Sequence, residues 1–84
     1  MKIEKTIGIG AVVQKCGVSE KQLRYWQKSG YITPEKVVCG NRTYRRYRDS
    51  DLALITEIKK MLDEGFTLFN AVKKAKTNLE DNHA

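Results

Sequence analysis

The sequence predicts a mainly α fold of four helices with one small β-hairpin, and three observations support this prediction. Apolar residues recur with helical spacing over long stretches of the chain. One interruption, KVVCGNRTYRRY, carries β-branched and aromatic residues on both sides of Gly40-Asn41, a pair typical of a tight hairpin turn. At 84 residues the chain has room for one small domain, so a large catalytic cleft is not expected.

The first two helices are expected to be joined by a short turn. The first spans about 10–16 and ends at Gly17, because glycine adopts the left-handed conformation that stops a helix. Ser19 followed by Gln22 fits a capping box at the start of a second helix over about 19–29. Two helices joined by a glycine-containing turn form a helix-turn-helix layout.

The second helix is expected to have one apolar and one basic face. Helical spacing places Leu23 and Trp26 on the apolar side, which assigns Trp26 to the core. The other side carries Lys21, Arg24, Tyr25 and Lys28. Tyr25 is therefore expected to point outward beside Arg24.

A β-hairpin is expected over about 36–48, since Pro34 forbids continuation of the second helix. Alternation along its second strand places Arg42, Tyr44, Arg46 and Arg48 on one side and Thr43, Arg45 and Tyr47 on the other. Basic side chains on both faces suit a wing lying along a phosphate backbone better than a buried sheet. The alternative is a hairpin that is merely solvated.

A third helix is expected to begin at Asp49 or Ser50 and to run to about Glu64, where Gly65 ends it. Asp51 lies in its first turn, where a carboxylate interacts favourably with the helix N-terminus. Its apolar stripe contains Leu52, Ile55, Ile58 or Lys59, and Leu62.

A fourth helix is expected from Leu68 to about Lys76, with Thr67 able to cap it. Its inward positions are Leu68, Ala71, Val72 and Ala75. We expect the residues that follow to fray. This divides the chain into one helix-turn-helix domain with its hairpin over 1–77 and a tail over 78–84.

Positive charge is concentrated in one third of the chain. Between Lys21 and Arg48 there are eight basic residues and one acidic residue, Glu35, which leaves +7 there and −1 in the remainder of a chain whose net charge is +6. A localised basic patch with interleaved tyrosines suits a polyanion, because Lys and Arg contacts to phosphates supply most of the sequence-independent affinity for nucleic acid.

Other function classes find little support in the residues. Cys16 and Cys39 are too far apart for a CxxC motif, so we expect reduced structural thiols and no metal site. We find no acid-base pair, activated nucleophile or phosphate-binding glycine loop, and therefore expect neither an enzyme nor a cofactor. The opening MKIEKTIGIG has no long apolar run, so neither a secretory signal nor a membrane span is expected and the cytoplasm is the default location.

The segments IGAVVQKCGVSEKQLRYW, GYITP, GNRTYRRY, DSDLALITEIKKMLDEGFTL and NAVKKA, taken in order, resemble the DNA-binding domain of MerR-type transcription regulators. The resemblance covers residues 7–77 and includes the family patterns G-V-S, L-R-Y plus an aromatic residue, Y-R-x-Y ahead of D-L, and L-x-x-G-F-S/T-L. It implies a winged helix-turn-helix with the second helix in the major groove and the hairpin on the adjacent backbone.

The resemblance also implies which residues meet DNA. Those expected from the second helix are Ser19, Lys21, Arg24 and Tyr25, and those expected from the wing are Arg42, Tyr44, Arg45 and Arg46. We add Lys28 and Lys36 from the basic patch. Reading the residues alone favours Arg24 for base readout, because arginine can bond bidentately to guanine in the major groove.

Departures from the family pattern affect the expected partners. The long dimerisation helix and effector domain of typical regulators have no counterpart in these 84 residues, so we expect no small-molecule effector. Three alternatives stay open for a homodimer: it is absent, it is weak or depends on DNA, or it uses the short N-terminal segment. Thr43 replaces a frequent wing glycine, and Asn70 replaces a frequent glutamate.

Two other functions remain open at this stage. The first is an excisionase-like architectural or recombination-accessory role, in which small winged-helix domains act without effector domains and bind closely spaced repeats with bending. The second is a protein-interaction adaptor, in which the basic face would meet an acidic protein. The leading hypothesis is sequence-specific binding of double-stranded DNA by a regulator.

Overall fold

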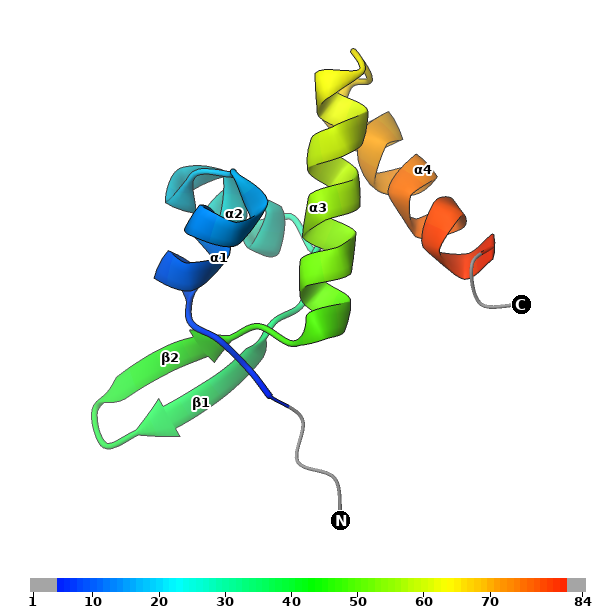
Figure 1. Cartoon of the computed structure of the whole chain (residues 1–84). Helices are drawn as coiled ribbons and strands as arrows, with labels where there is room; N and C mark the ends of the chain where they lie inside the picture. The colour runs from blue at the N-terminus through cyan, green and yellow to red at the C-terminus, as the bar shows by residue number, and fades with distance from the viewer. Residues whose placement is uncertain (1–4, 82–84) are drawn as a thin grey trace.

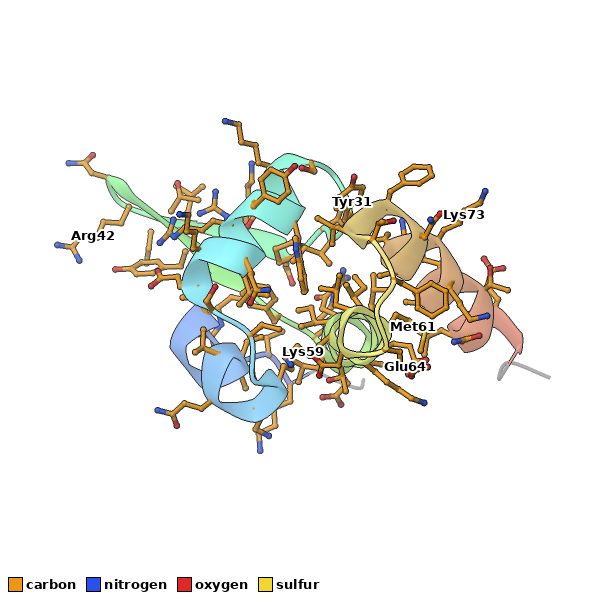
Figure 2. All side chains as sticks on the ribbon, turned by 90° about the horizontal axis from the view of Figure 1, so that it is seen from above. Tyr31, Arg42, Lys59, Met61, Glu64 and Lys73 are labelled. Carbon is orange, nitrogen blue, oxygen red and sulfur yellow. The ribbon has the colours of Figure 1, made fainter. Side chains whose placement is uncertain are left out.

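A computed structural model describes residues 5–81, and this part of the chain forms four helices and a two-stranded antiparallel sheet (Figure 1). The elements are α1 (Ile9–Cys16), α2 (Glu20–Lys28), β1 (Glu35–Cys39), β2 (Arg42–Arg46), α3 (Asp49–Asp63) and α4 (Leu68–Asp81). Helix α3 is central, with α1 and α2 on one side of it and α4 on the other (Figures 1 and 2). The predicted mainly helical fold with a β-hairpin wing is confirmed.

The turn between α1 and α2 has the predicted geometry. Gly17 ends α1 with φ of 69°, and its N–H donates to the carbonyl oxygen of Val13 at 3.1 Å. The Ser19 Oγ accepts from the Gln22 N–H at 3.0 Å, and the Gln22 Oε1 accepts from the Ser19 N–H at 2.9 Å. The reciprocal capping box therefore satisfies two backbone donors at the start of α2.

The hairpin register leaves Gly40 and Asn41 as a two-residue loop, because Cys39 pairs with Arg42. Gly40 has φ of 64° and Asn41 has a negative φ, the pattern of a type II′ turn with glycine in its first central position. Lys36 lies opposite Arg45 on this register. The wing, defined as Glu35–Arg46, thus presents Lys36 and Arg45 on one face and Tyr44 on the other.

A short N-terminal segment extends the sheet beyond the hairpin. Ile7 and Tyr47 exchange both backbone hydrogen bonds, with N···O distances of 3.0 and 2.8 Å. Arg46 reinforces this contact: its Nη2 donates to the Thr6 carbonyl oxygen at 2.9 Å, and its Nε donates to the Thr6 Oγ1 at 3.2 Å. The base of the wing is therefore held against the chain that leads into α1.

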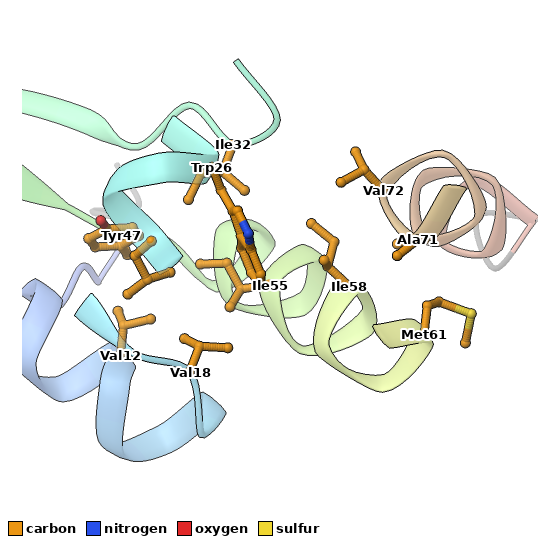
Figure 3. Packing of buried hydrophobic residues seen from close by; sticks show 12 residues of the cluster. Val12, Val18, Trp26, Ile32, Tyr47, Ile55, Ile58, Met61, Ala71 and Val72 are labelled. Atoms are coloured by element: carbon orange, nitrogen blue, oxygen red, sulfur yellow. The ribbon is translucent and has the colours of Figure 1, made fainter. Parts of the chain in front are cut away.

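The core lies between α3 and its neighbours on both sides. Figure 3 shows the Trp26 ring between α2 and α3, next to Ile55, and Trp26 is only 2% exposed. The assignment of Trp26 to the core is thus confirmed. Strand alternation places Tyr47 on the same side of the wing as Arg45, but Tyr47 is 1% exposed. The second strand ends at Arg46, and Tyr47 then packs its ring into the core.

Two details of α3 and α4 differ from the prediction. The apolar stripe of α3 buries Met61, whereas the predicted Leu62 is half-buried. Helix α4 continues to Asp81, so residues 78–81 are helical where we expected a frayed tail, and the Asn78 Nδ2 donates to the Glu57 Oε2 at 3.0 Å. This bond and the half-buried Leu79 give the last turn contacts that periodicity did not predict. The rest of the predicted tail lies outside the described residues, and the domain division at residue 77 stays a prediction.

None of the helices among residues 5–81 combines the length and apolar character needed to cross a membrane.

Candidate nucleic-acid interface

Helix α2 divides its side chains as predicted. Leu23 and Trp26 are buried, whereas Tyr25 is 56% exposed. The basic residues of the outer face, Lys21, Arg24 and Lys28, are also exposed. The capping box positions this face, because it fixes the start of the helix and therefore the direction in which each later side chain points.

A hollow of about 350 Å³ separates the basic face of α2 from the wing. We call it the helix-wing hollow, and its lining residues are Arg24, Gln27, Lys28, Lys36 and Arg45. Four of the five carry a positive charge, and no carboxylate from residues 5–81 lines the hollow. Two elements that are separate in sequence therefore bring their cations to one concave site, which is the arrangement expected for binding an oxyanion.

A neighbouring hollow of about 310 Å³ lies between the start of α1, α2 and β2. Its lining residues are Gly8, Ile9, Arg24, Thr43, Tyr44, Arg45 and Arg46. Arg24 and Arg45 line both hollows, so these two side chains occupy the centre of the concave surface between helix and wing.

Two buried polar atoms at the helix-wing hollow lack a hydrogen-bond partner within the described residues. They are the Oε1 of Gln27 and the Nε of Arg45. Buried polar groups are normally hydrogen-bonded, so this acceptor and this donor are exceptions at the base of the concave basic surface. The sequence reasoning missed Gln27, although its position three residues after Arg24 places it on the same side of α2.

The predicted wing residues do not share one environment. Arg42 extends from the tip of the hairpin, which is the end of the hairpin farthest from α3 and α4 (Figure 2). Tyr44 is 47% exposed. Arg46 is half-buried and is engaged with Thr6. We therefore separate Arg42 and Tyr44, which are free to meet an extended partner, from Arg46, which also joins the wing to the N-terminal segment.

Arg24 forms an ion pair with Glu20 one helical turn earlier. The Glu20 Oε1 accepts from the Arg24 Nη2 at 2.8 Å and from its Nε at 3.3 Å. Both side chains remain more than half exposed. Within residues 5–81 no other predicted DNA-binding residue has a carboxylate partner.

Tyr47 lies beneath this surface, and its hydroxyl is buried without a partner in the described part of the chain. Burial raises the pKa of Tyr47, because the phenolate would lose its hydration. Arg45 and Arg24 act to lower this pKa, whereas Asp51 and Glu20 act to raise it. The phenol thus stays neutral between the core and the charged surface.

The two cysteines do not line either hollow of the interface. Both are free thiols: Cys16 is half-buried and accepts a hydrogen bond from Thr56 at 3.5 Å, whereas Cys39 is exposed near the wing tip. The exposure of Cys39 does not fit the structural role that we expected for it. Among residues 5–81 no three His, Cys, Asp or Glu side chains lie close enough together to hold a metal ion.

Comparison with known proteins places these features in a family. A family model described as MerR HTH family regulatory protein matches residues 8–77. The HTH-type transcriptional repressor CarH of Myxococcus xanthus is 32% identical over 71 residues, which cover 83% of this chain and 23% of that protein.

Two further relatives match the same region. The mercuric resistance operon regulatory protein of Bacillus cereus is 38% identical over 61 residues, covering 71% of this chain and 44% of that protein. The HTH-type transcriptional regulator HmrR of Sinorhizobium medicae is 34% identical over 62 residues, covering 74% of this chain and 41% of that protein. The chain thus spans less than half of the length of each of these relatives.

Proposed function

The chain belongs to the MerR family of helix-turn-helix regulatory proteins, and from this premise we propose that it binds double-stranded DNA sequence-specifically as a transcription regulator. The observation that carries the proposal is the helix-wing hollow, where cations from α2 and from the wing converge and the described part of the chain contributes no carboxylate to the lining. A convex, evenly solvated basic surface would offer no such site.

Helix α2 enters the major groove in this proposal. An α-helix with its side chains is about 10–12 Å across and the groove is about 12 Å wide, so a single helix fits. Arg24, near the middle of the exposed face, reads a guanine through its O6 and N7 atoms. Ser19, Lys21 and Tyr25 flank it and meet neighbouring bases and phosphates.

The wing follows the phosphate backbone beside the groove. A phosphate enters the helix-wing hollow, where Lys28 from α2 and Lys36 and Arg45 from the wing supply charge-assisted hydrogen bonds. Arg42 and Tyr44, nearer the tip, extend the contact along the backbone. Arg46 contributes one edge of its guanidinium while it holds the N-terminal segment.

The test is selection of bound sequences from a randomised duplex pool, followed by titration of the selected duplex at several salt concentrations. We expect an enriched motif and an affinity that falls steeply with salt, with a slope of about −0.9 for each phosphate contacted. Arg24→Ala should lower the affinity for the selected duplex by roughly 5- to 150-fold and relax the preference at one base pair.

Lys76→Ala on α4 is the matched control, because it removes an exposed positive charge from a helix that packs against α3 away from the wing (Figure 1). It should change the affinity far less than Arg24→Ala does. Absence of salt-dependent binding to any duplex would refute the proposal. Binding with steep salt dependence but no enriched motif would instead support an architectural role.

A further inference from the structure

We propose that Glu20 is a positioning residue for DNA sequence discrimination: its carboxylate orients Arg24 toward a base edge and keeps its guanidinium away from phosphates. This inference rests on the DNA-binding function proposed above and deepens it, because it assigns a role to an acidic side chain on an otherwise basic face. Glu20 lies in the first turn of α2, immediately after the cap residue.

The geometry of the pair leaves the right part of the guanidinium free. A guanidinium has five N–H donors, arranged on two side edges and one end. The Glu20 Oε1 accepts from Nε and Nη2 of Arg24, so it occupies one side edge. The end formed by Nη1 and Nη2 keeps its outward N–H donors, and this fork is suited to bidentate contact with guanine O6 and N7.

The electrostatics of the pair favour a base over a phosphate. A guanidinium without a partner is attracted to any phosphate oxygen, and such contacts carry no sequence information. A carboxylate 2.8 Å from Nη2 offsets the positive charge of Arg24 and repels an approaching phosphate. Guanine O6 and N7 are neutral acceptors, which the carboxylate repels far less.

A purely stabilising role accounts for little of this arrangement. Both side chains are more than half exposed, and exposed ion pairs separated by one helical turn contribute little to stability. Lys59 and Asp63 form a pair with the same spacing and an Nζ···Oδ2 distance of 2.7 Å on α3, near its end remote from the wing (Figure 1). That pair lies outside the surface proposed to bind DNA, and it supplies the control for Glu20.

The experiment compares Glu20→Gln with Asp63→Asn, both of which remove one negative charge and one ion pair spaced by four residues. Affinities of the full chain are measured by fluorescence anisotropy for the duplex selected by the wild type and for a scrambled duplex, at several salt concentrations. Thermal unfolding of each variant reports any loss of folding.

We expect Glu20→Gln to bind the scrambled duplex several-fold more tightly, with a salt slope steeper by about 0.9, which corresponds to one added phosphate contact. The ratio of affinities for the selected and scrambled duplexes should fall on the order of tenfold, the effect of losing one discriminating contact. Asp63→Asn should leave this ratio unchanged. In an Arg24→Ala background, Glu20→Gln should no longer alter the ratio, because its effect passes through Arg24.

Equal ratios for Glu20→Gln and Asp63→Asn would overturn the positioning role while leaving DNA binding intact. A wild-type protein that binds all duplexes equally would do the same, since there would be no discrimination to assign. A wild-type protein that binds no duplex would refute the proposed function itself, and the role of Glu20 with it. Glu20→Ala serves as a second variant, because its side chain cannot form a residual hydrogen bond to Arg24.

Discussion

Replacing Tyr47 with phenylalanine is expected to stabilise the fold, because the residue buries a hydroxyl that has no hydrogen-bond partner among the described residues. A buried polar group without a partner costs about 1–3 kcal/mol of desolvation. Phenylalanine keeps the ring that packs in the core and removes only the oxygen. We therefore expect the free energy of unfolding to rise by about 1 kcal/mol, whereas Tyr47→Ala should lower it by about 3–5 kcal/mol.

The same substitution should change how stability depends on alkaline pH. Burial raises the pKa of Tyr47 above 10.0 in the folded protein, so the folded state holds this proton more tightly than the unfolded state does. Stability from this group is therefore fully present below pH 10 and is lost as the pH rises through the folded pKa. Phenylalanine has no proton to lose, so the advantage of Tyr47→Phe should widen above pH 10.

Urea unfolding of the wild type and of Tyr47→Phe, followed by circular dichroism at pH 7 and at several values above 10, measures both effects. Tyr44→Phe is the matched control, because Tyr44 is 47% exposed. That variant should remain within about 0.5 kcal/mol of the wild type. A loss of more than 1 kcal/mol in Tyr47→Phe at pH 7 would show that the hydroxyl does bond in the folded state and would refute the reasoning.

Three further predictions concern local structure, each checked by urea unfolding. Ser19→Ala should lower the free energy of unfolding by about 1 kcal/mol, because it removes the Oγ that caps the Gln22 N–H; an unchanged value would mean that the capping box is dispensable. Gly17→Ala should lower the free energy of unfolding by about 1 kcal/mol, because φ is 69° there. Gly10→Ala should raise it by about 0.5–1 kcal/mol, because Gly10 lies within α1 and an added Cβ meets nothing there. A change of the same sign in both variants would contradict this backbone argument. Asn78→Ala should lower the free energy of unfolding by about 1 kcal/mol, because it removes the hydrogen bond to Glu57. An unchanged free energy of unfolding would show that this bond in the last turn of α4 contributes nothing to stability.

Elements with local causes could be predicted from the sequence. The cap at Ser19 and the stop at Gly17 are short-range backbone effects, and both could be predicted from a few adjacent residues. The hairpin loop at Gly40 follows from the same kind of local chemistry. Helical periodicity separated Trp26 from Tyr25, because the direction in which a helical side chain points depends only on its position along the helix.

Features that depend on contacts between distant segments could not be predicted in this way. Tyr47 pairs with Ile7, forty residues earlier, and its ring lies in the core; strand alternation contains no information about either contact. The last turn of α4 is held by Glu57 on α3, so helix propensity could not locate its end. The helix-wing hollow likewise requires α2 and the wing to be placed against each other. A periodic pattern specifies which way a side chain points, but only packing specifies what it meets there.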